Sequence, residues 1–336
     1  MKRKKILVTG GAGYIGSHTV VELYLSGYMP MILDNLCNSS LINLDGINKI
    51  LKTNIPFFKI DCSDYDKMLE FFLQNKDIYA CIHFAAYKSV SESVKNPKKY
   101  FENNIGSTEV LLKCLSKNKF KNLIFSSSCT VYGTPDVLPV DEKSPFKKAE
   151  SPYAKTKQIC ENLIKDSCCN SISLRYFNPI GSHESHLIGD CSLDKPSNLV
   201  PIITEVACGI RDALIVNGND YNTHDGTCVR DYIHVQDLAI AHVKALDYLL
   251  GNSGNYTFNV GTGYGLSVLD IIKSFENATN IKLKYTIGPR RKGDIEKIFS
   301  NGDLIKKILL WEPVKTTREA MLSSWKWQIN KLSNYH

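Results

Sequence analysis

The segment Ile6-Leu7-Val8-Thr9-Gly10-Gly11-Ala12-Gly13-Tyr14-Ile15-Gly16 decides the fold. An apolar strand pattern leads into a glycine cluster, and a helical pattern with apolar residues at positions 20, 21, 23 and 25 follows. Glycines here allow a tight turn, close approach of the backbone to a pyrophosphate, and close packing of the helix on the strand. The helix N-terminus offers unpaired N–H groups to the phosphates. The order of strand, glycine turn and helix therefore predicts a dinucleotide-binding unit.

The spacing of Gly10, Gly13 and Gly16 is one residue wider than the usual fingerprint, and a plain turn is the alternative interpretation. A second apolar strand, Met31-Ile32-Leu33, ends in Asp34. An acid at this point suits the ribose 2′-hydroxyl of NAD and repels the 2′-phosphate of NADP. The two signals together predict NAD as the cofactor.

Strand and helix patterns alternate through the first half of the chain. Strands are predicted at residues 5–9, 31–34, 57–60, 80–84, 122–125 and 172–175. Such alternation implies a doubly wound parallel sheet with helices on both faces, and ligands then bind beyond the carboxyl ends of the strands. After about Asn178 the order is less regular. We therefore predict an α/β fold with a Rossmann-type NAD-binding domain over residues 1–178 and a smaller α/β substrate domain over residues 179–336, with possible crossover segments.

Length and charge are those of an ordinary globular protein. The 336 residues exceed the size at which single cores usually stop growing, and a hydrophobic content of 43% allows a full core. The net charge of +7 comes from 41 basic and 34 acidic residues spread along the chain. Only residues 2–5 form a tight basic run, which indicates a solvated N-terminus and no nucleic-acid partner.

Eleven cysteines occur mostly within apolar segments, with no Cys-x-x-Cys pair and no signal sequence. We interpret them as reduced core residues of a cytoplasmic protein. No apolar stretch approaches membrane-spanning length, so no membrane association is expected. His183 and His186 flank Glu184 in a predicted loop without a further ligand at metal spacing. We expect these histidines to be solvated, and we predict no metal site.

The predicted chemistry lies at the end of the fifth strand and on the helix that follows. Ser128 closes that strand, and the segment Ser151-Pro152-Tyr153-Ala154-Lys155-Thr156-Lys157 has the pattern of a helix start. Tyr153 and Lys157 share one helix face, and a cation there would lower the pKa of the phenol. We predict that Ser128 binds a substrate hydroxyl, that Tyr153 takes its proton, and that hydride leaves the same carbon for the nicotinamide. A surface helix contact is the alternative interpretation of the pair.

These residues resemble the extended short-chain dehydrogenase/reductase family, and further segments resemble its UDP-galactose 4-epimerase group over essentially the whole chain. The segments are residues 33–39, 83–86, 92–94, 125–133, 175–179, 198–201, 218–221, 225–227, 229–235 and 325–328. The resemblance implies reversible epimerisation of UDP-galactose and UDP-glucose at C4. A transient 4-keto sugar, tightly bound NAD and a tyrosine base are implied with it.

The resemblance also implies which residues bind the two ligands. Those implied for NAD are Gly10, Gly13, Tyr14, Ile15, Gly16, Asp34, Asn35, Asn38, Ser39, Asp61, Cys62, Phe84, Ala85, Ala86, Lys88, Asn103, Ser126, Tyr153, Lys157 and Tyr176. Those implied for the UDP-sugar are Ser128, Tyr153, Phe177, Asn178, Asn198, Leu199, Arg230, Arg291, Asp294 and Ile298. The planar fork of an arginine suits a diphosphate, whereas surface pairing with Asp231 and Asp294 is the alternative for Arg230 and Arg291.

Three specificity questions follow from the resemblance. Dehydratases of this fold carry Thr-Asp-Glu where this chain has Ser128-Cys129-Thr130, so 4,6-dehydration lacks its acid and base. We interpret Cys129 as a core thiol. Ile298 falls at the position that limits the room beside the sugar's 2-substituent. Its intermediate size leaves open whether N-acetylated sugars are accepted, and the alternative interpretation is that Ile298 fills the core. An epimerase of UDP-glucuronate is the other alternative within the enzyme class; it would need a cation for the sugar carboxylate, and the sequence does not locate one.

The resemblance further implies a homodimer, in which residues 100–114 and the helix of Tyr153 pack against the same helices of a second subunit. A non-catalytic NAD-binding sensor is the alternative from a different functional class. Such a module has no need of a base aimed at the cofactor, so Ser128, Tyr153 and Lys157 favour the enzyme.

Overall fold

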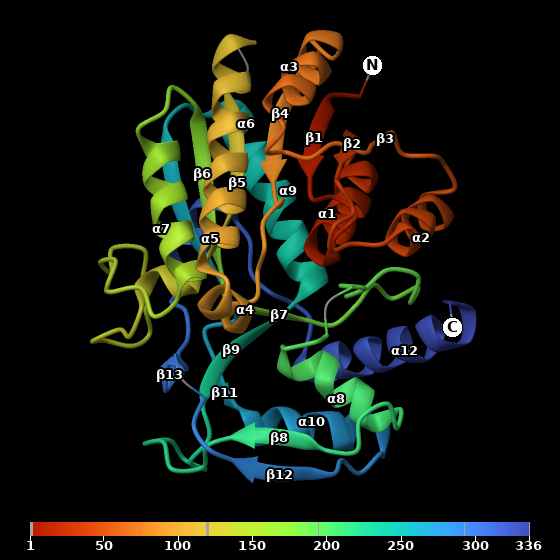
Figure 1. The fold of residues 1–336 in the computed structure, drawn as a ribbon, viewed down its shortest axis with the longest axis vertical. Coiled ribbons are helices and arrows are strands. Elements are labelled where there is room, and N and C mark those ends of the chain that lie inside the picture. Colours follow the sequence, from red (N-terminus) through yellow and green to blue (C-terminus); the bar gives the residue numbers. More distant parts are fainter. Residues whose placement is uncertain (1–2, 119–120, 194, 292, 336) are drawn as a thin grey trace.

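The computed structural model describes residues 3–118, 121–193, 195–291 and 293–335, so Lys2 of the basic N-terminal run lies outside the described residues. Its centre is a seven-stranded parallel sheet in the order β10-β6-β5-β4-β1-β2-β3 (Figure 1). The strands are β1 Lys5–Thr9, β2 Met29–Leu33, β3 Phe57–Phe58, β4 Ile78–His83, β5 Asn122–Ser128, β6 Asn170–Tyr176 and β10 Asn255–Val260. The predicted doubly wound α/β fold is confirmed.

All six predicted strands are present; β1 has the predicted ends, and the other five differ in theirs. β3 has only two residues, and β5 continues three residues beyond Phe125, to Ser128. The seventh strand, β10, was missed because its sequence alternates polar and apolar residues at the edge of the sheet, where only its second half is buried.

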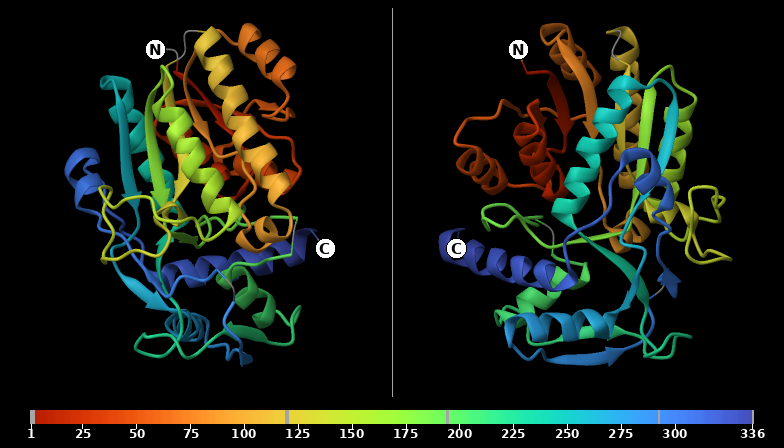
Figure 2. Two further views of the ribbon diagram at one scale, coloured as in Figure 1. Left: turned by 60° about the vertical axis from the view of Figure 1, so that its left-hand side comes forward. Right: turned by 180° about the vertical axis from the view of Figure 1, so that it is seen from behind.

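Helices cover both faces of this sheet (Figure 2). One face is covered by α1 Tyr14–Leu25, α2 Leu41–Leu51, α9 Val235–Gly251 and α11 Asp303–Leu309, whose apolar residues share a core with the strands. The other face is covered by α3 Tyr65–Gln74, α6 Gly106–Lys117 and α7 Pro152–Lys165. Short helical elements connect the strands to these helices: α4 Val90–Lys95, α5 Pro97–Tyr100, the π-helix η1 Phe101–Ile105 and the 3-10 helix η2 Cys129–Tyr132.

A smaller unit lies beyond the carboxyl ends of β1 to β6. Its strands are β7 Asn178–Ile180, β8 Leu214–Asn217, β9 Val229–His234, β11 Gly265–Ser267, β12 Tyr285–Gly288 and β13 Lys297–Ile298. β9 pairs with β7, β11 and β13, and β8 pairs with β12. The helices are α8 Leu199–Ala207, α10 Val268–Thr279 and α12 Thr317–Tyr335, which enclose a separate hydrophobic core.

The chain crosses between the two units more than once. After β9 it returns through α9 and β10 to the large sheet, and α11 packs against that same region. A domain boundary at residue 178 therefore stays a prediction. The segments α9, β10 and α11 follow this boundary in the sequence but pack with the large sheet, so they are the crossover segments.

Two further expectations concern the surface and the thiols. Among the described residues, no helix has the length and apolar character needed to cross a membrane. The cysteines are free thiols, and most are buried as expected, whereas Cys37 and Cys168 are exposed.

Candidate active site

One cavity of about 420 Å³ lies between the carboxyl ends of the large sheet and the smaller unit. Every residue predicted to bind NAD lines it, from the glycine turn at Gly10 to Tyr176. The residues predicted to bind the UDP-sugar also line it, with the exception of Ile298. The two predicted ligand sites are therefore parts of one continuous space.

The glycine turn forms one wall of this cavity. Gly10 has a φ of +68°, and a Cβ on it would lie 2.8 Å from the backbone nitrogen of Ala85. A Cβ on Gly16 would lie 2.3 Å from the carbonyl oxygen of Gly10. The chain can therefore make this turn, and pack α1 against it, only with glycine at these two positions. The N-terminus of α1 begins at Tyr14 and faces the cavity with its first residues.

Asp34 lies directly after β2 at the edge of the glycine turn. Its carboxylate accepts hydrogen bonds from Ala12 N at 3.1 Å, from Leu36 N at 2.9 Å and from Ser39 Oγ at 2.8 Å. The side chain is thus fixed in the cavity wall as an acceptor, the role that a ribose hydroxyl requires. The glycine turn, the helix N-terminus and this carboxylate together fit NAD.

The three predicted catalytic residues come together on β5 and α7. Ser128 Oγ accepts a hydrogen bond from Thr130 Oγ1 at 3.0 Å, and Ser128 is near enough to Tyr153 to lower its pKa against the effect of burial. Lys157 Nζ donates to the carbonyl oxygen of Ser126 at 2.6 Å, and it lies 5.9 Å from the centre of the Tyr153 ring. Ser151 caps α7 through Ala154 N, with Pro152 in the first turn, and so places Tyr153 at the start of the helix beside the end of β5.

The prediction that Lys157 lowers the pKa of Tyr153 is wrong for the protein side chains alone. Burial raises the pKa of Tyr153 to about 12, although the hydrogen bond with Ser128 acts in the opposite direction. Burial also lowers the pKa of Lys157 to about 8. The ammonium group is directed to the Ser126 carbonyl and not to the phenol oxygen, so desolvation dominates at the tyrosine.

The arginines of the second half show different surroundings. Arg230 Nη1 donates to the carbonyl oxygen of Val229 at 2.9 Å, while Asp231 is fully buried and accepts hydrogen bonds from Thr262 and Ser300. The alternative pairing of Arg230 with Asp231 is therefore not what the structure contains.

Arg291 does form the alternative ion pair, since its guanidinium contacts the Asp294 carboxylate at 2.7 Å. Both side chains nevertheless line the cavity. Asn178 at the start of β7, and Asn198 and Leu199 at the start of α8, lie along the same wall.

Ile298 lies behind this wall. It is 2% exposed and belongs to a hydrophobic cluster with Phe177 and Cys129, of which Phe177 lines the cavity. Its influence on the sugar's 2-substituent stays a prediction, and within the described structure it would act through Phe177. Cys129 is buried in this cluster, as expected for a core thiol.

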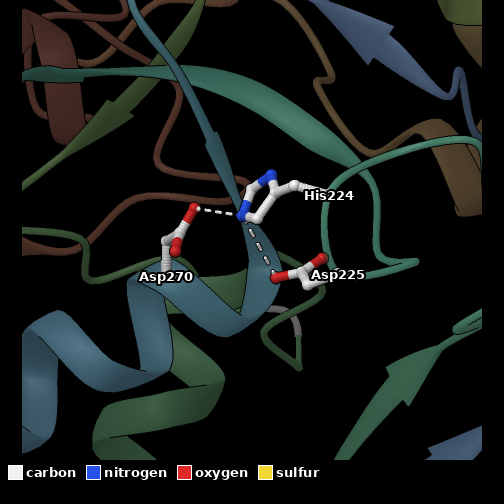
Figure 3. A group of neighbouring side chains, drawn as sticks. All are labelled: His224, Asp225 and Asp270. Atoms are coloured by element: carbon white, nitrogen blue, oxygen red, sulfur yellow. Dashed lines mark ion pairs between the residues drawn. The ribbon is translucent and has the colours of Figure 1, made fainter.

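Metal-ligand residue types occur in two other places. His183 is 5% exposed and bonds to Ser185 Oγ at 2.8 Å, so the expectation that it is solvated is wrong; His186 is partly buried. Figure 3 shows His224 between two carboxylates, with Nε2 at 3.2 Å from Asp270 and 3.6 Å from Asp225.

Both carboxylates beside His224 already have structural roles. Asp225 accepts from Thr227 N at 2.9 Å, and Asp270 forms the capping box of α10 with Ser267. The group is therefore explained by the capping of α10 and the turn at Asp225, with His224 in contact with both carboxylates.

Sequence reasoning missed several residues that line the cavity, among them Tyr87, Asp190 and Trp327. Asp190 lies in an irregular segment where no periodicity distinguishes an inward side chain from an outward one. Burial opposes its ionisation, but Lys88 at 3.3 Å and hydrogen bonds from Ser192 outweigh that effect and lower the pKa of Asp190. Lys88 is thus engaged with a carboxylate across the cavity.

Comparisons with known proteins agree with this geometry. The family described as GDP-mannose 4,6 dehydratase matches residues 7–323. The UDP-glucose 4-epimerase of Haemophilus influenzae is 44% identical over 98% of this chain and 99% of its own length. That of Drosophila melanogaster is 42% identical over 98% of both chains.

A solved structure gives the same result for the fold. The UDP-glucose 4-epimerase of Bifidobacterium longum in complex with NAD+ and UDP has a TM-score of 0.95 and 41% identity, and the match covers 98% of this chain and 100% of that one. At the two positions that carry the dehydratase acid and base, this chain has a buried thiol, Cys129, and Thr130. The chain therefore belongs to the extended short-chain dehydrogenase/reductases and, within them, to the UDP-glucose 4-epimerase family.

Proposed function

We propose that this protein interconverts UDP-galactose and UDP-glucose by inverting the configuration at C4, with NAD as a retained cofactor. The observation that carries the proposal is that Ser128, Tyr153 and Lys157 line one cavity together with the glycine turn that binds dinucleotides. The base and the cofactor that accepts hydride therefore face the same cavity, as oxidation of an alcohol requires.

The roles of the three residues follow from their positions. Tyr153 takes the proton of the 4-hydroxyl as C4 gives up its hydride, and Ser128 holds the same hydroxyl oxygen. Bound NAD supplies the hydride acceptor and donor and adds a positive charge to the cavity, which opposes the effect of burial on the Tyr153 pKa. Lys157 contributes a second cation, which the Ser126 carbonyl holds in place. Return of the hydride to the opposite face of C4, and of the proton from Tyr153 to the 4-oxygen, leaves only the configuration at C4 changed.

Binding of the nucleotide is proposed to fall to the second half of the cavity. Arg230 has its remaining N–H groups available for a diphosphate, and Arg291 is oriented by Asp294. Asn178 and Asn198 offer amide groups for the uridine or the sugar. A firm hold on UDP leaves the keto sugar free to turn within the site, which inversion demands.

Two alternatives within the enzyme class concern the sugar. Acceptance of UDP-N-acetylhexosamines is proposed to depend on the space beside Phe177, which packs in one buried cluster with Ile298. Epimerisation of UDP-glucuronate requires a cation for its carboxylate, and Lys88 is already paired with Asp190. The similarity to UDP-glucose 4-epimerases favours the neutral hexoses. A non-catalytic NAD sensor is disfavoured because its cavity would not need Ser128, Tyr153 and Lys157 together.

The decisive experiment is incubation of the purified protein with UDP-galactose without added NAD, followed by NMR analysis of the products. Appearance of UDP-glucose supports the proposal together with the retained cofactor. Tyr153→Phe, which removes only the phenol oxygen, is the matched control and should form product far more slowly. Absence of product from the wild type, even after NAD is supplied, would refute it.

We further propose a homodimer built on α6, α7 and the adjoining η1. Apolar side chains on these elements remain only partly buried: Phe101, Ile105, Leu112, Ile159 and Leu163. Since η1 and α7 pack side by side, these residues offer one surface for a twofold contact. Light scattering should give twice the chain mass, and Ile159→Asp should shift the protein toward the monomer.

A cytoplasmic location is proposed on the state of the thiols. The described cysteines are free, and a reducing compartment maintains that state. Cell fractionation tests this location, and recovery of the protein outside the cytoplasm would contradict it.

A further inference from the structure

The 181–193 segment connects β7 to the region before α8 and lies against the N-terminal half of the chain. Figures 1 and 2 show it passing between α2 and α12. Gly181, Asp190 and Ser192 of this segment line the cavity, and Gly181 accepts a hydrogen bond from the hydroxyl of Tyr14, next to the glycine turn. The cavity predicted to hold the dinucleotide is therefore closed by two parts of the chain that are far apart in sequence.

One buried side chain joins these two parts. Asn43, on α2, is fully buried, and its Nδ2 donates to the carbonyl oxygen of Ala12 in the glycine turn at 3.1 Å. The same Nδ2 donates to the carbonyl oxygen of Gly189 at 3.1 Å, and Oδ1 accepts from Gly189 N at 3.2 Å. A single amide thus binds the glycine turn and both backbone groups of one residue of the 181–193 segment.

These contacts require the amide specifically. The side chain must donate to two carbonyl oxygens and accept from one N–H, which a carboxylate of the same shape cannot do because it has acceptors only. These three hydrogen bonds are buried, so a lost partner leaves a buried polar group unsatisfied.

Other contacts bring the segment to the same place. On α2, Gly46 leaves no space for a side chain, since a Cβ there would lie 2.1 Å from the carbonyl oxygen of Leu187. On the far side, Trp327 Nε1 of α12 donates to the carbonyl oxygen of Asp190 at 3.3 Å. The segment is therefore held between α2 and α12. Tyr14, whose hydroxyl donates to the carbonyl oxygen of Gly181 at 2.5 Å, and Lys88, which pairs with Asp190, also hold it on the cofactor side. Asn43 is the buried attachment, and it contacts the glycine turn as well.

We infer that Asn43 is a positioning residue that keeps the 181–193 segment closed over NAD and thereby sets how slowly the cofactor is released. The inference rests on the proposed use of NAD in this cavity. A dinucleotide between the glycine turn and the segment leaves when the two separate, and the contacts of Asn43 must break for that to happen.

The test measures exchange of cofactor, not turnover. Holoprotein is incubated with excess etheno-NAD, and the dinucleotide that remains bound is analysed over time. Asn43→Asp preserves the shape of the side chain but places a carboxylate oxygen against two carbonyl oxygens, which it repels. Release of the dinucleotide should be at least about tenfold faster, as expected for lost buried hydrogen bonds. Gly46→Ala should also speed release, because it displaces the segment at Leu187 without touching Asn43. Asn48→Asp is the matched control, since it adds the same charge to α2 and keeps an acceptor for Ile55 N.

Hydrogen exchange of the 181–193 segment supplies a second readout, with faster exchange expected in Asn43→Asp and Gly46→Ala and not in Asn48→Asp. Release at the wild-type rate from both folded variants overturns the inference. Faster release from Asn43→Asp but not from Gly46→Ala also overturns the inference, because the added charge, and not displacement of the segment, would then explain the effect. A wild type that holds no dinucleotide and binds no etheno-NAD refutes the proposed function itself, which separates the two failures.

Discussion

Replacement of Arg175 by methionine should be among the most destabilising single changes on the large sheet. Arg175, on β6, donates to both carboxylate oxygens of Glu161 on α7, through Nε at 3.0 Å and Nη2 at 2.7 Å. Both side chains are only 7% exposed. Arg175 also donates to the Tyr132 hydroxyl at 3.0 Å, and Ser127 Oγ donates to Glu161. The pair therefore fixes α7, with Tyr153 and Lys157, onto the sheet.

The magnitude follows from what the substitution leaves behind. Arg175→Met keeps most of the volume but leaves the Glu161 carboxylate buried without its cation, so the free energy of unfolding should fall by about 3–5 kcal/mol. In the double variant Arg175→Met, Glu161→Met both charges are absent, and the loss should be well below the sum of the two single losses.

Urea unfolding of the wild type, both single variants and the double variant measures these differences as a cycle. The exposed pair of Lys98 and Glu102 provides the control, since Lys98→Met should change stability no more than an ordinary surface substitution. A loss below about 1 kcal/mol for Arg175→Met would show that the buried pair contributes no more than a surface pair, and the reasoning would fail.

Three further predictions concern the site. Tyr153→Phe should retain NAD and lose most turnover, because it removes only the proton acceptor; full activity in an NMR assay would exclude Tyr153 as the base. Arg230→Ala should raise KM for UDP-galactose sharply with bound NAD unchanged, since its cation is proposed for the diphosphate; an unchanged KM removes Arg230 from the site. Lys157→Met should reveal the lowered lysine pKa. Between about pH 8, the folded pKa, and the ordinary lysine value near 10.5, the unfolded wild type binds more protons at this residue, so its stability should rise with pH relative to the variant. Urea unfolding at pH 7.5 and 9.5 tests this, and a difference independent of pH contradicts it.

The sequence predicted those features that depend on local patterns. The glycine turn, the acid after β2 and the serine at the end of β5 each combine a strand period with a residue type whose position along the chain fixes its place in the sheet. The site could be anticipated because carboxyl ends of parallel strands meet at one edge.

What the sequence did not predict depends on contacts between distant segments. β10 joins the sheet at its edge after a long excursion, and Asp190 faces the cavity from an irregular segment. The pKa of Tyr153 depends on burial and on the direction of the Lys157 ammonium, neither of which the spacing of two residues determines. Ile298 is buried in one hydrophobic cluster with Phe177 and does not line the cavity, a relation visible only in the packing.

The return of the chain to the large sheet has a consequence for synthesis on the ribosome. β6 is paired on one side by β5, but its other neighbour, β10, is made only after residues 177–254 have been translated. At about 5–20 residues per second this takes on the order of ten seconds, during which β6 is an open edge with unpaired backbone groups. The nascent chain therefore presents an apolar edge strand until translation has passed β10, and this interval is when chaperone binding or mispairing would compete with folding.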